Sequence, residues 1–292
     1  MEKIRIVTDS ASDLPADLQK KYDIDVLSFP VIIGDSEFDS RIDFDSEGFY
    51  KLMAEHDEIP KTSQITSFQF MELYYSYYKE GYTDLFLILI NSKGSATYNN
   101  SLMAVDFLYD EHPECEGKIR VHSFDSGSYC CAYGHVAVEA GRMLQEGASA
   151  AQIGSYLEEA VPRRKVYFGI YDLKYAGKSG RIPSAAAFVG DKLGIKPIMK
   201  IWDHEITTAA KCRGEKKLIS RLCQMVLDEM EPGTPYQIVY GNNPAAKDEM
   251  TAAMMEALGY GPTEYYQIGV VVAANSGPAV VGVSFDVREG WQ

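Results

Sequence analysis

The sequence predicts an α/β protein of two domains, a parallel-sheet domain followed by a mixed-sheet domain. The chain has 292 residues, about twice the ~150 residues of a typical domain. In its first half, short apolar runs alternate with amphipathic stretches, the pattern of βαβ units and hence of a parallel sheet covered by helices. In its second half, some apolar runs are joined by local turns, as in antiparallel pairs. We expect the domains to be 1–150 and 151–292.

The composition predicts a cytoplasmic globular protein with no nucleic-acid partner. Hydrophobic residues make up 46% and charged residues 24%, unlike disordered or fibrous sequences. The formal net charge of −14 repels nucleic-acid phosphates and anionic lipids. No apolar run approaches the ~18 residues of a membrane span, and the start lacks the pattern of a secretory signal. The cysteines have no CxxC spacing, so we expect reduced core thiols at Cys115, Cys130, Cys131, Cys212 and Cys223.

Apolar periodicity and capping residues predict the elements of the first half. In order, we expect a strand at 4–10, a helix opened by Ser12 or Asp13 before Pro15, two extended segments within 23–34, helices at 46–58 and 67–82, a buried strand at 84–90, a helix at 101–109, a strand at 118–126 and a helix at about 129–145. Ser46 is the capping candidate of its helix. The tyrosine-rich helix at 67–82 either lines an apolar cavity or, more simply, packs a stripe into the core.

The second half opens with a helix and then changes pattern. In order, we expect a helix at 151–164, strand segments at 165–173, 195–211 and 235–242, with a turn at Asp203–His204, helices at 214–230 and 244–258, and two closing apolar runs within 264–285 that are split at Asn275–Pro278.

Small polar clusters follow four of the apolar runs. They are Thr8–Ser10, Ser92–Thr97, Asp125–Ser126 and Asn275–Gly277. In open parallel sheets, ligands bind beyond the carboxyl ends of the strands, and hydroxyls with free backbone N–H groups at helix starts can hold an anion. The alternative is that each cluster only caps a helix.

No motif for a nucleophile, a nucleotide or a metal accompanies these clusters. GKSGRI is not GxSxG, there is no GxGxxG or phosphate-binding loop, and the five histidines lack paired spacing. We therefore expect no catalytic residue, no metal and no cofactor. His122 with Asp125 is a conceivable metal pair, but a structural histidine is the simpler interpretation.

Six motifs in one order resemble the DegV family, the fatty-acid-binding, FakB-type subunits of bacterial fatty acid kinase. They are TDSASDL at 8–14, KTSQ at 61–64, NSKGSATY at 91–98, LKYAGKSGRI at 173–182, IKPIM at 195–199 and NSGP at 275–278. The resemblance covers essentially the whole chain. It implies a two-domain α/β protein that holds one long-chain fatty acid in a tunnel between the domains and presents the carboxylate to a separate kinase.

The resemblance also implies three residues of the first half as ligand contacts. Thr62 matches the threonine of the family's TSQ motif, which contacts the carboxylate. Ser92 and Ser95 match the two serine positions of its SSxxSGTY loop, and Ser95 is favoured because it lies nearer the helix start.

In the second half, Asn275, Ser276 and Gly277 match the start of the family's HTGPG motif, with asparagine in place of the histidine that would contact the carboxylate. Lys211 and Arg213 match a basic stretch that resembles the family's kinase-docking surface.

The energetics suit a fatty acid. Burying ~14 methylenes at ~0.8 kcal/mol each gives about 11 kcal/mol before the costs of association, so the tail can carry the affinity. The head then needs only hydrogen-bond donors that replace water. We expect neutral donors, because a lysine or arginine clamp would neutralise the carboxylate that must attack phosphorus.

The sequence therefore predicts a carrier without turnover. It takes a fatty acid during transient contact with a membrane surface and offers it to a fatty acid kinase catalytic subunit, which supplies ATP and Mg²⁺. Two alternatives stay open: a lipid-sensing or storage protein with no kinase, which Asn275 allows, and a hydrolase that uses Asp9 or Asp125.

Overall fold

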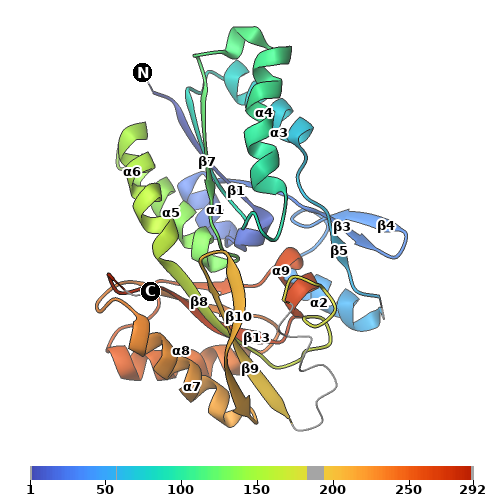
Figure 1. Ribbon diagram of the computed structural model, residues 1–292, viewed down its shortest axis with the longest axis vertical. Helices are drawn as coiled ribbons and strands as arrows, with labels where there is room; N and C mark the ends of the chain where they lie inside the picture. The colour runs from blue at the N-terminus through green and yellow to red at the C-terminus, as the bar shows by residue number, and fades with distance from the viewer. Residues whose placement is uncertain (1, 57, 183–193, 291–292) are drawn as a thin grey trace.

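The computed structural model describes residues 2–56, 58–182 and 194–290. Two main sheets, one from each half of the chain, lie one above the other, and a small third sheet flanks them (Figure 1). The N-terminal sheet is parallel and the C-terminal sheet is mixed, so the predicted fold class is confirmed. The domain boundary after residue 150 stays a prediction.

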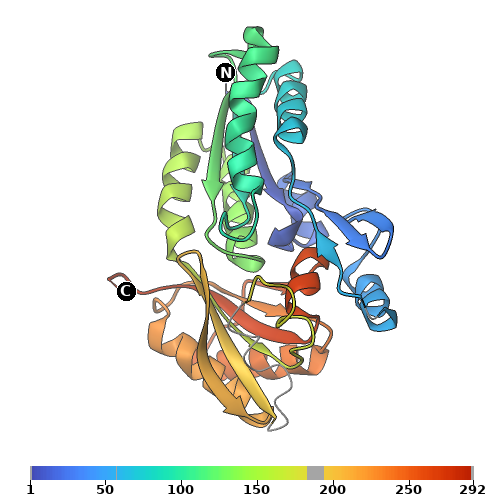
Figure 2. The ribbon, with the colours of Figure 1, turned by 45° about the vertical axis from the view of Figure 1, so that its right-hand side comes forward.

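The N-terminal sheet has four parallel strands in the order β2-β1-β6-β7. They are β1 Ile4–Asp9, β2 Asp25–Leu27, β6 Asp84–Leu89 and β7 Arg120–Asp125. Every residue of β6 is buried, as expected for a strand covered on both faces. Because the strands are parallel, their carboxyl ends meet at one edge, and this edge points towards the C-terminal sheet (Figure 2). The predicted polar clusters after β1, β6 and β7 therefore share one edge.

Helices cover both faces of this sheet, with α3 and α4 on one side and α5 and α6 on the other (Figures 1 and 2). The helices of this half are α1 Ala16–Tyr22, α2 Ser46–Glu55, α3 Ser67–Lys79, α4 Thr97–Glu111, α5 Cys131–Gln145 and α6 Ala150–Ala160, with 3₁₀ turns η1 Ser10–Ser12, η2 Pro113–Cys115 and η3 Val161–Arg163. The small antiparallel sheet has the order β4-β3-β5, from β3 Pro30–Ile33, β4 Ser36–Asp39 and β5 Lys61–Thr62.

Two capping predictions are wrong. Neither Ser12 nor Asp13 caps α1, which follows Pro15 without a side-chain cap, because the chain first makes the turn η1, capped by Asp9. Helix α2 is capped by Asp45, whose Oδ1 accepts from the Gly48 N–H at 2.7 Å, and not by Ser46.

Two further details of this half bear on the predictions. Helix α4 begins at Thr97, four residues earlier than predicted. In α3, Tyr74 and Tyr77 are buried in the main core, which supports the interpretation as a core stripe.

The C-terminal sheet has the order β10-β9-β8-β13-β11-β12, and only β11 and β12 pair in parallel. Its strands are β8 Arg164–Ile170, β9 Ile195–Trp202, β10 Glu205–Arg213, β11 Tyr236–Tyr240, β12 Glu264–Gln267 and β13 Val280–Asp286. Helices α7 Lys216–Glu229 and α8 Pro244–Leu258 pack against one face. Asp203 and His204 form the predicted turn, with φ of 49° and 65°.

The closing segment departs from the prediction. Between β12 and β13 the chain forms a short helix, α9 Val270–Ser276, so the cluster at Asn275–Gly277 forms the end of a helix and does not follow a strand. Helix α9 contacts η1, α2 and β5. This packing, which sequence periodicity does not encode, decides its conformation.

The core is apolar and holds the thiols as expected: all five cysteines are free and buried. In the part of the chain that the structure describes, no helix is long and apolar enough to cross a membrane.

Candidate functional site

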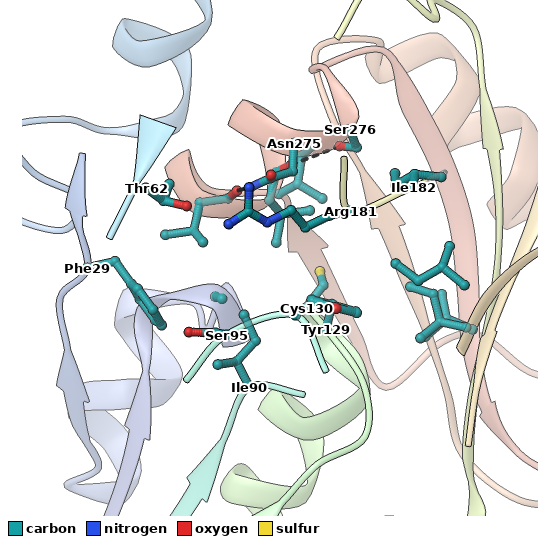
Figure 3. Close-up of a pocket in the computed structure, with 18 of the residues that line it drawn as sticks. Phe29, Thr62, Ile90, Ser95, Tyr129, Cys130, Arg181, Ile182, Asn275 and Ser276 are labelled. Carbon is teal, nitrogen blue, oxygen red and sulfur yellow. Dashed lines mark hydrogen bonds between the residues drawn. The ribbon is translucent and has the colours of Figure 1, made fainter. Parts of the chain in front are cut away.

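A cavity of about 100 Å³ lies between the carboxyl edge of the N-terminal sheet and the face of the C-terminal sheet that α7 and α8 leave uncovered (Figure 3). Its lining divides into an apolar wall and a polar end. The apolar wall comes mainly from alternate residues of neighbouring strands, which point to the same face of a sheet.

Strands β8 to β11 build the apolar wall. Val166 pairs with Ile201, and Ile201 pairs with Ile206, so these three side chains form one row across the sheet. Phe168 and Val239 belong to the next row and also line the cavity. Phe29 and Ile90 close it from the N-terminal side (Figure 3). An acyl chain would meet only hydrocarbon on this wall.

Four of the six predicted ligand residues lie at the polar end of the cavity: Thr62, Ser95, Asn275 and Ser276. They come from β5, the loop before α4, and the end of α9, and Figure 3 shows them around one space. In the described part of the chain, the Thr62 hydroxyl makes no hydrogen bond within the protein. Ser95 Oγ lies 2.9 Å from Thr97 Oγ1. Two hydroxyls can therefore turn towards a ligand.

The two polar side chains of α9 are partly occupied. Asn275 Nδ2 donates to the Val271 carbonyl at 2.8 Å, which leaves its second N–H and its carbonyl oxygen available. The Ser276 hydroxyl lies 3.0 Å from the Val272 carbonyl and 2.8 Å from the Gly277 carbonyl. Since it has one proton, it must turn away from both carbonyls to donate to a ligand.

Ser92 and Gly277, the other two predicted residues, lie outside the lining. The Ser92 N–H donates to Asp125 Oδ1 at 3.0 Å and so fixes the loop that carries Ser95. Gly277 ends α9 with φ of 78°, and a Cβ there would lie 3.0 Å from the ring of Tyr175. Only glycine fits both the backbone conformation and the space.

Arg181 also lines the cavity, which the prediction of neutral donors missed. It lies in the LKYAGKSGRI motif, and its guanidinium extends into the space between α9 and Ser95 (Figure 3). Its Nη1 donates to the Ser179 carbonyl at 3.2 Å, and no acidic side chain in the described ranges pairs with it. Burial raises the pKa of Tyr129, another lining residue, to about 12 although the charge of Arg181 opposes this. The basic residue after GKSG was the signal that could have found this group.

This architecture is shared with known proteins. The DegV family model, described as that of an uncharacterised protein, matches residues 3–288. The chain belongs to the DegV family. The resemblance inferred from the six motifs is thus confirmed.

Relatives of the DegV chain match it over nearly its whole length. A DegV domain-containing protein of Clostridium perfringens is 32% identical over 296 residues, which cover 99% of this chain and 100% of the relative. A protein of Thermotoga maritima named as a fatty acid-binding protein is 29% identical over 293 residues, covering 98% and 99%.

Two solved structures from Thermotoga maritima superpose closely on this DegV chain. One, described as revealing a fatty acid binding function, is 26% identical with a TM-score of 0.83 and covers 99% of this chain and 100% of its own. The other, described as a DegV lipid binding protein, is 28% identical with a TM-score of 0.82 and covers 99% of each chain.

The acidic residues of the alternative hydrolase have structural partners in this DegV fold. Asp9 is fully buried and accepts from the Ile90 N–H at 2.7 Å, the Ala11 N–H at 3.0 Å and the Tyr133 hydroxyl at 2.6 Å. Burial raises the pKa of Asp9 to about 6. Neither Asp9 nor Asp125 lines the cavity, so the geometry gives the hydrolase no support.

The metal pair considered at His122 does not form. His122 Nε2 lies 3.1 Å from Asp84 Oδ1 and its ring stacks on Phe86, so this histidine has structural partners. Among the described residues, no group of three or more His, Cys, Asp or Glu side chains could hold a metal ion.

The predicted docking residues lie away from the cavity. Lys211 and Arg213 are exposed on β10, the edge strand of the C-terminal sheet, on either side of the buried Cys212. Alternation along the strand presents both to the same side.

Proposed function

We propose that this protein binds one long-chain fatty acid, with its acyl tail against the apolar wall and its carboxylate at the polar end of the cavity. The observation that carries the proposal is the division of one cavity lining into strand-borne aliphatic side chains and a cluster of donors at Thr62, Ser95 and Asn275. Relatives across the whole length are named for the same ligand class.

The cavity has room for a large part of such a ligand. At ~10–15 Å³ for each water, 100 Å³ has room for roughly seven to ten waters. A methylene group occupies about as much space as a water, so the cavity accommodates a comparable number of carbons of an acyl tail.

The charge at the polar end suits a carboxylate. Arg181 adds one positive charge to the hydroxyl donors, in a chain whose net charge is −14. Because Arg181 is exposed, its charge is screened by solvent and leaves the carboxylate partly nucleophilic. Attraction of the head group and reactivity towards phosphorus are then compatible.

We further propose that the protein is a carrier and not an enzyme, and that it needs no cofactor. In the cytoplasm it would acquire the fatty acid during transient contact with a membrane surface and present the carboxylate to a fatty acid kinase catalytic subunit. The kinase would dock on Lys211 and Arg213. The competing function, lipid storage or sensing without a kinase, is favoured by Asn275 in place of the family histidine.

Ligand binding is tested by native mass spectrometry of gently purified protein, followed by delipidation and titration with a fluorescent fatty acid. We expect a retained fatty acid and saturation at one molecule per chain. No saturable binding at micromolar protein would refute the proposal.

The kinase role is tested separately, by acyl-phosphate formation with a fatty acid kinase. Arg213→Glu should abolish the product and leave fatty-acid affinity intact, whereas Lys20→Glu, an equal charge reversal at an exposed position of α1, should do neither. Loss of affinity in Arg213→Glu, or full product, would count against docking there and favour storage or sensing.

A further inference from the structure

Helix α9 is part of the C-terminal half by sequence, but N-terminal elements hold it. It lies beside α2 (Figure 1) and contacts η1, α2 and β5. Val271, Val272, Asn275 and Ser276 of α9 all line the cavity. Whatever fixes the position of α9 therefore also fixes Asn275 and Ser276 at the polar end of the cavity.

The start of α9 is fixed by Asp13, the aspartate of the TDSASDL motif that the proposed function leaves unexplained. The Gly269 N–H, at the N-cap of α9, donates to Asp13 Oδ1 at 2.8 Å. Asp13 is only 5% exposed and has φ of 50°. Few residues other than glycine adopt this left-handed conformation, and aspartate and asparagine are among those that do.

The contact is tight from the side of α9 as well. A Cβ on Gly269 would lie 2.7 Å from Asp13 Oδ1, so with any larger residue at 269 the carboxylate would have to shift away from its present place beside this N–H. One residue earlier, the Tyr50 hydroxyl of α2 donates to the Ile268 carbonyl. Two side chains of the N-terminal half thus hold two consecutive residues that lead into α9.

This arrangement has an energetic cost. Asp13 Oδ2 is buried and makes no hydrogen bond of ordinary geometry among the described residues. Burial raises the pKa of Asp13 to about 7, although the Cys130 thiol, the Gly269 N–H and the charge of Arg41 act to lower it. A buried acceptor without a full hydrogen-bond partner destabilises the folded protein. A destabilising arrangement of this kind is typically kept at a functional site, because selection for stability alone would not favour it.

We propose that Asp13 is a positioning residue for the fatty-acid head group, which acts through Gly269 and α9 on Asn275 and Ser276. The ligand in this statement rests on the proposed function. The contact between Asp13 and the start of α9 does not rest on it, because this contact is present in the protein without ligand.

The test compares four variants by hydrogen exchange of the ligand-free protein and by fluorescent fatty-acid titration. Asp13→Ala should speed amide exchange in 269–277, leave exchange in β11 unchanged, and weaken binding about tenfold, the equivalent of one hydrogen bond to a charged group. Gly269→Ala breaks the same contact from the other side without removing a charge, and should reproduce both effects. It also tests the proposal if Asp13→Ala does not fold.

Two controls separate positioning from other roles. Asp13→Asn keeps an acceptor and tolerates the left-handed backbone, so it should retain near-parental exchange and affinity. Glu47→Ala removes another contact between α2 and this segment, the exposed bond from Gln267 Nε2 at 2.6 Å, and should change neither measurement.

The outcomes are separable. Unchanged exchange in 269–277 in both Asp13→Ala and Gly269→Ala would overturn the proposal, as would faster exchange in β11 by the same factor, which would mean general destabilisation. Equal losses in Asp13→Asn and Asp13→Ala would show that the charge, and not the hydrogen bond, matters. If the parent binds no fatty acid, the proposed function fails, and exchange alone still decides whether Asp13 holds α9.

Discussion

The two faces of the C-terminal sheet consist of similar apolar residues, yet one is sealed and the other is partly open. On the sealed face, Ile238, Val283 and Phe285 are fully buried in a cluster with residues of α7 and α8. On the open face, Val166 and Val239 are also buried, but they line the cavity. Apolar composition therefore does not distinguish a core from a binding site.

The difference comes from what packs against each face. Helices α7 and α8 present side-chain ridges that fill the surface of the sheet to the density of a protein interior. The open face meets loops at the carboxyl edge of the N-terminal sheet and the short helix α9, which contributes two valines and two polar side chains to the cavity lining. Loop ends do not cover the sheet as completely as the face of a helix does, so the cavity remains there. Hydrogen-bond donors lie at its rim.

The largest expected effect separates the two faces directly. Ile238 and Val239 are neighbours on β11 that point to opposite faces. Ile238→Ala should lower the free energy of unfolding by about 2–5 kcal/mol, because it leaves a void in a sealed core, and should not change fatty-acid affinity. Val239→Ala should cost only about 1–2 kcal/mol, because it enlarges an existing cavity, and should alter affinity.

Urea denaturation and ligand titration of both variants measure these quantities. If Ile238→Ala and Val239→Ala had the same effects on stability and on affinity, the two faces would not differ as the cavity suggests.

The next effect concerns Asp13, which holds α9 over the open face. Its pKa is raised by burial from 3.8 to about 7, so between these values the folded protein binds more protons than the unfolded chain. The parent therefore loses stability as pH rises from about 4 to 7, by as much as about 4 kcal/mol. Asp13→Asn lacks this loss.

We expect the stability of Asp13→Asn relative to the parent to rise with pH up to about 7 and to stay level above it. Denaturant unfolding of both proteins at several pH values measures this difference, in which groups common to both cancel. A difference that does not vary with pH would mean that Asp13 does not titrate in this range.

The hydroxyls at the rim of the open face give a smaller effect. Thr62→Ala and Ser95→Ala should each weaken fatty-acid binding by about 1–3 kcal/mol, because a charged acceptor loses a donor, with little change in thermal midpoint. Thr66→Ala is a matched control: Thr66 caps α3, so its loss should cost about 1 kcal/mol of stability and no affinity. Unchanged affinity in both single variants and in the double variant would exclude the hydroxyls as donors.

Regular features of this molecule were predictable from local patterns. Strands such as β6 are continuous apolar runs, and polar residues at their ends necessarily gather at one edge of a parallel sheet. Positions such as Thr62 and Ser95 follow from a motif and a strand end, and both lie at the cavity. The turn at Asp203 and His204 follows from a two-residue break between strands.

Other features depend on tertiary contacts that local patterns do not contain. The run before Asn275 has the valines of a strand, but packing against η1 and α2 makes it a helix. Arg181 was missed because arguments about the reactivity of a carboxylate favoured neutral donors, whereas exposure weakens the effect of its charge. Ser92 lies in the same loop as Ser95 but outside the cavity lining, and the bond from its backbone N–H to Asp125 is a tertiary contact that the motif does not reveal.

The smallest expected effect concerns Asn275, at the rim of the open face. Histidine has an unperturbed pKa of about 6.5, so Asn275→His would add a positive charge near the carboxylate as pH falls below that value. Because Arg181 already supplies one charge in this space, the gain should be modest, about two- to fivefold in affinity between pH 8 and pH 5.5, equivalent to ~0.4–1 kcal/mol. The measured quantity is the ratio of the affinities of Asn275→His and the parent at each pH. This ratio cancels the titrations of the ligand, Asp9 and Asp13, which both proteins share, and Asn275→Ala should give a ratio that does not vary with pH. A constant ratio for Asn275→His as well would mean that position 275 shapes the end of α9 without facing the carboxylate.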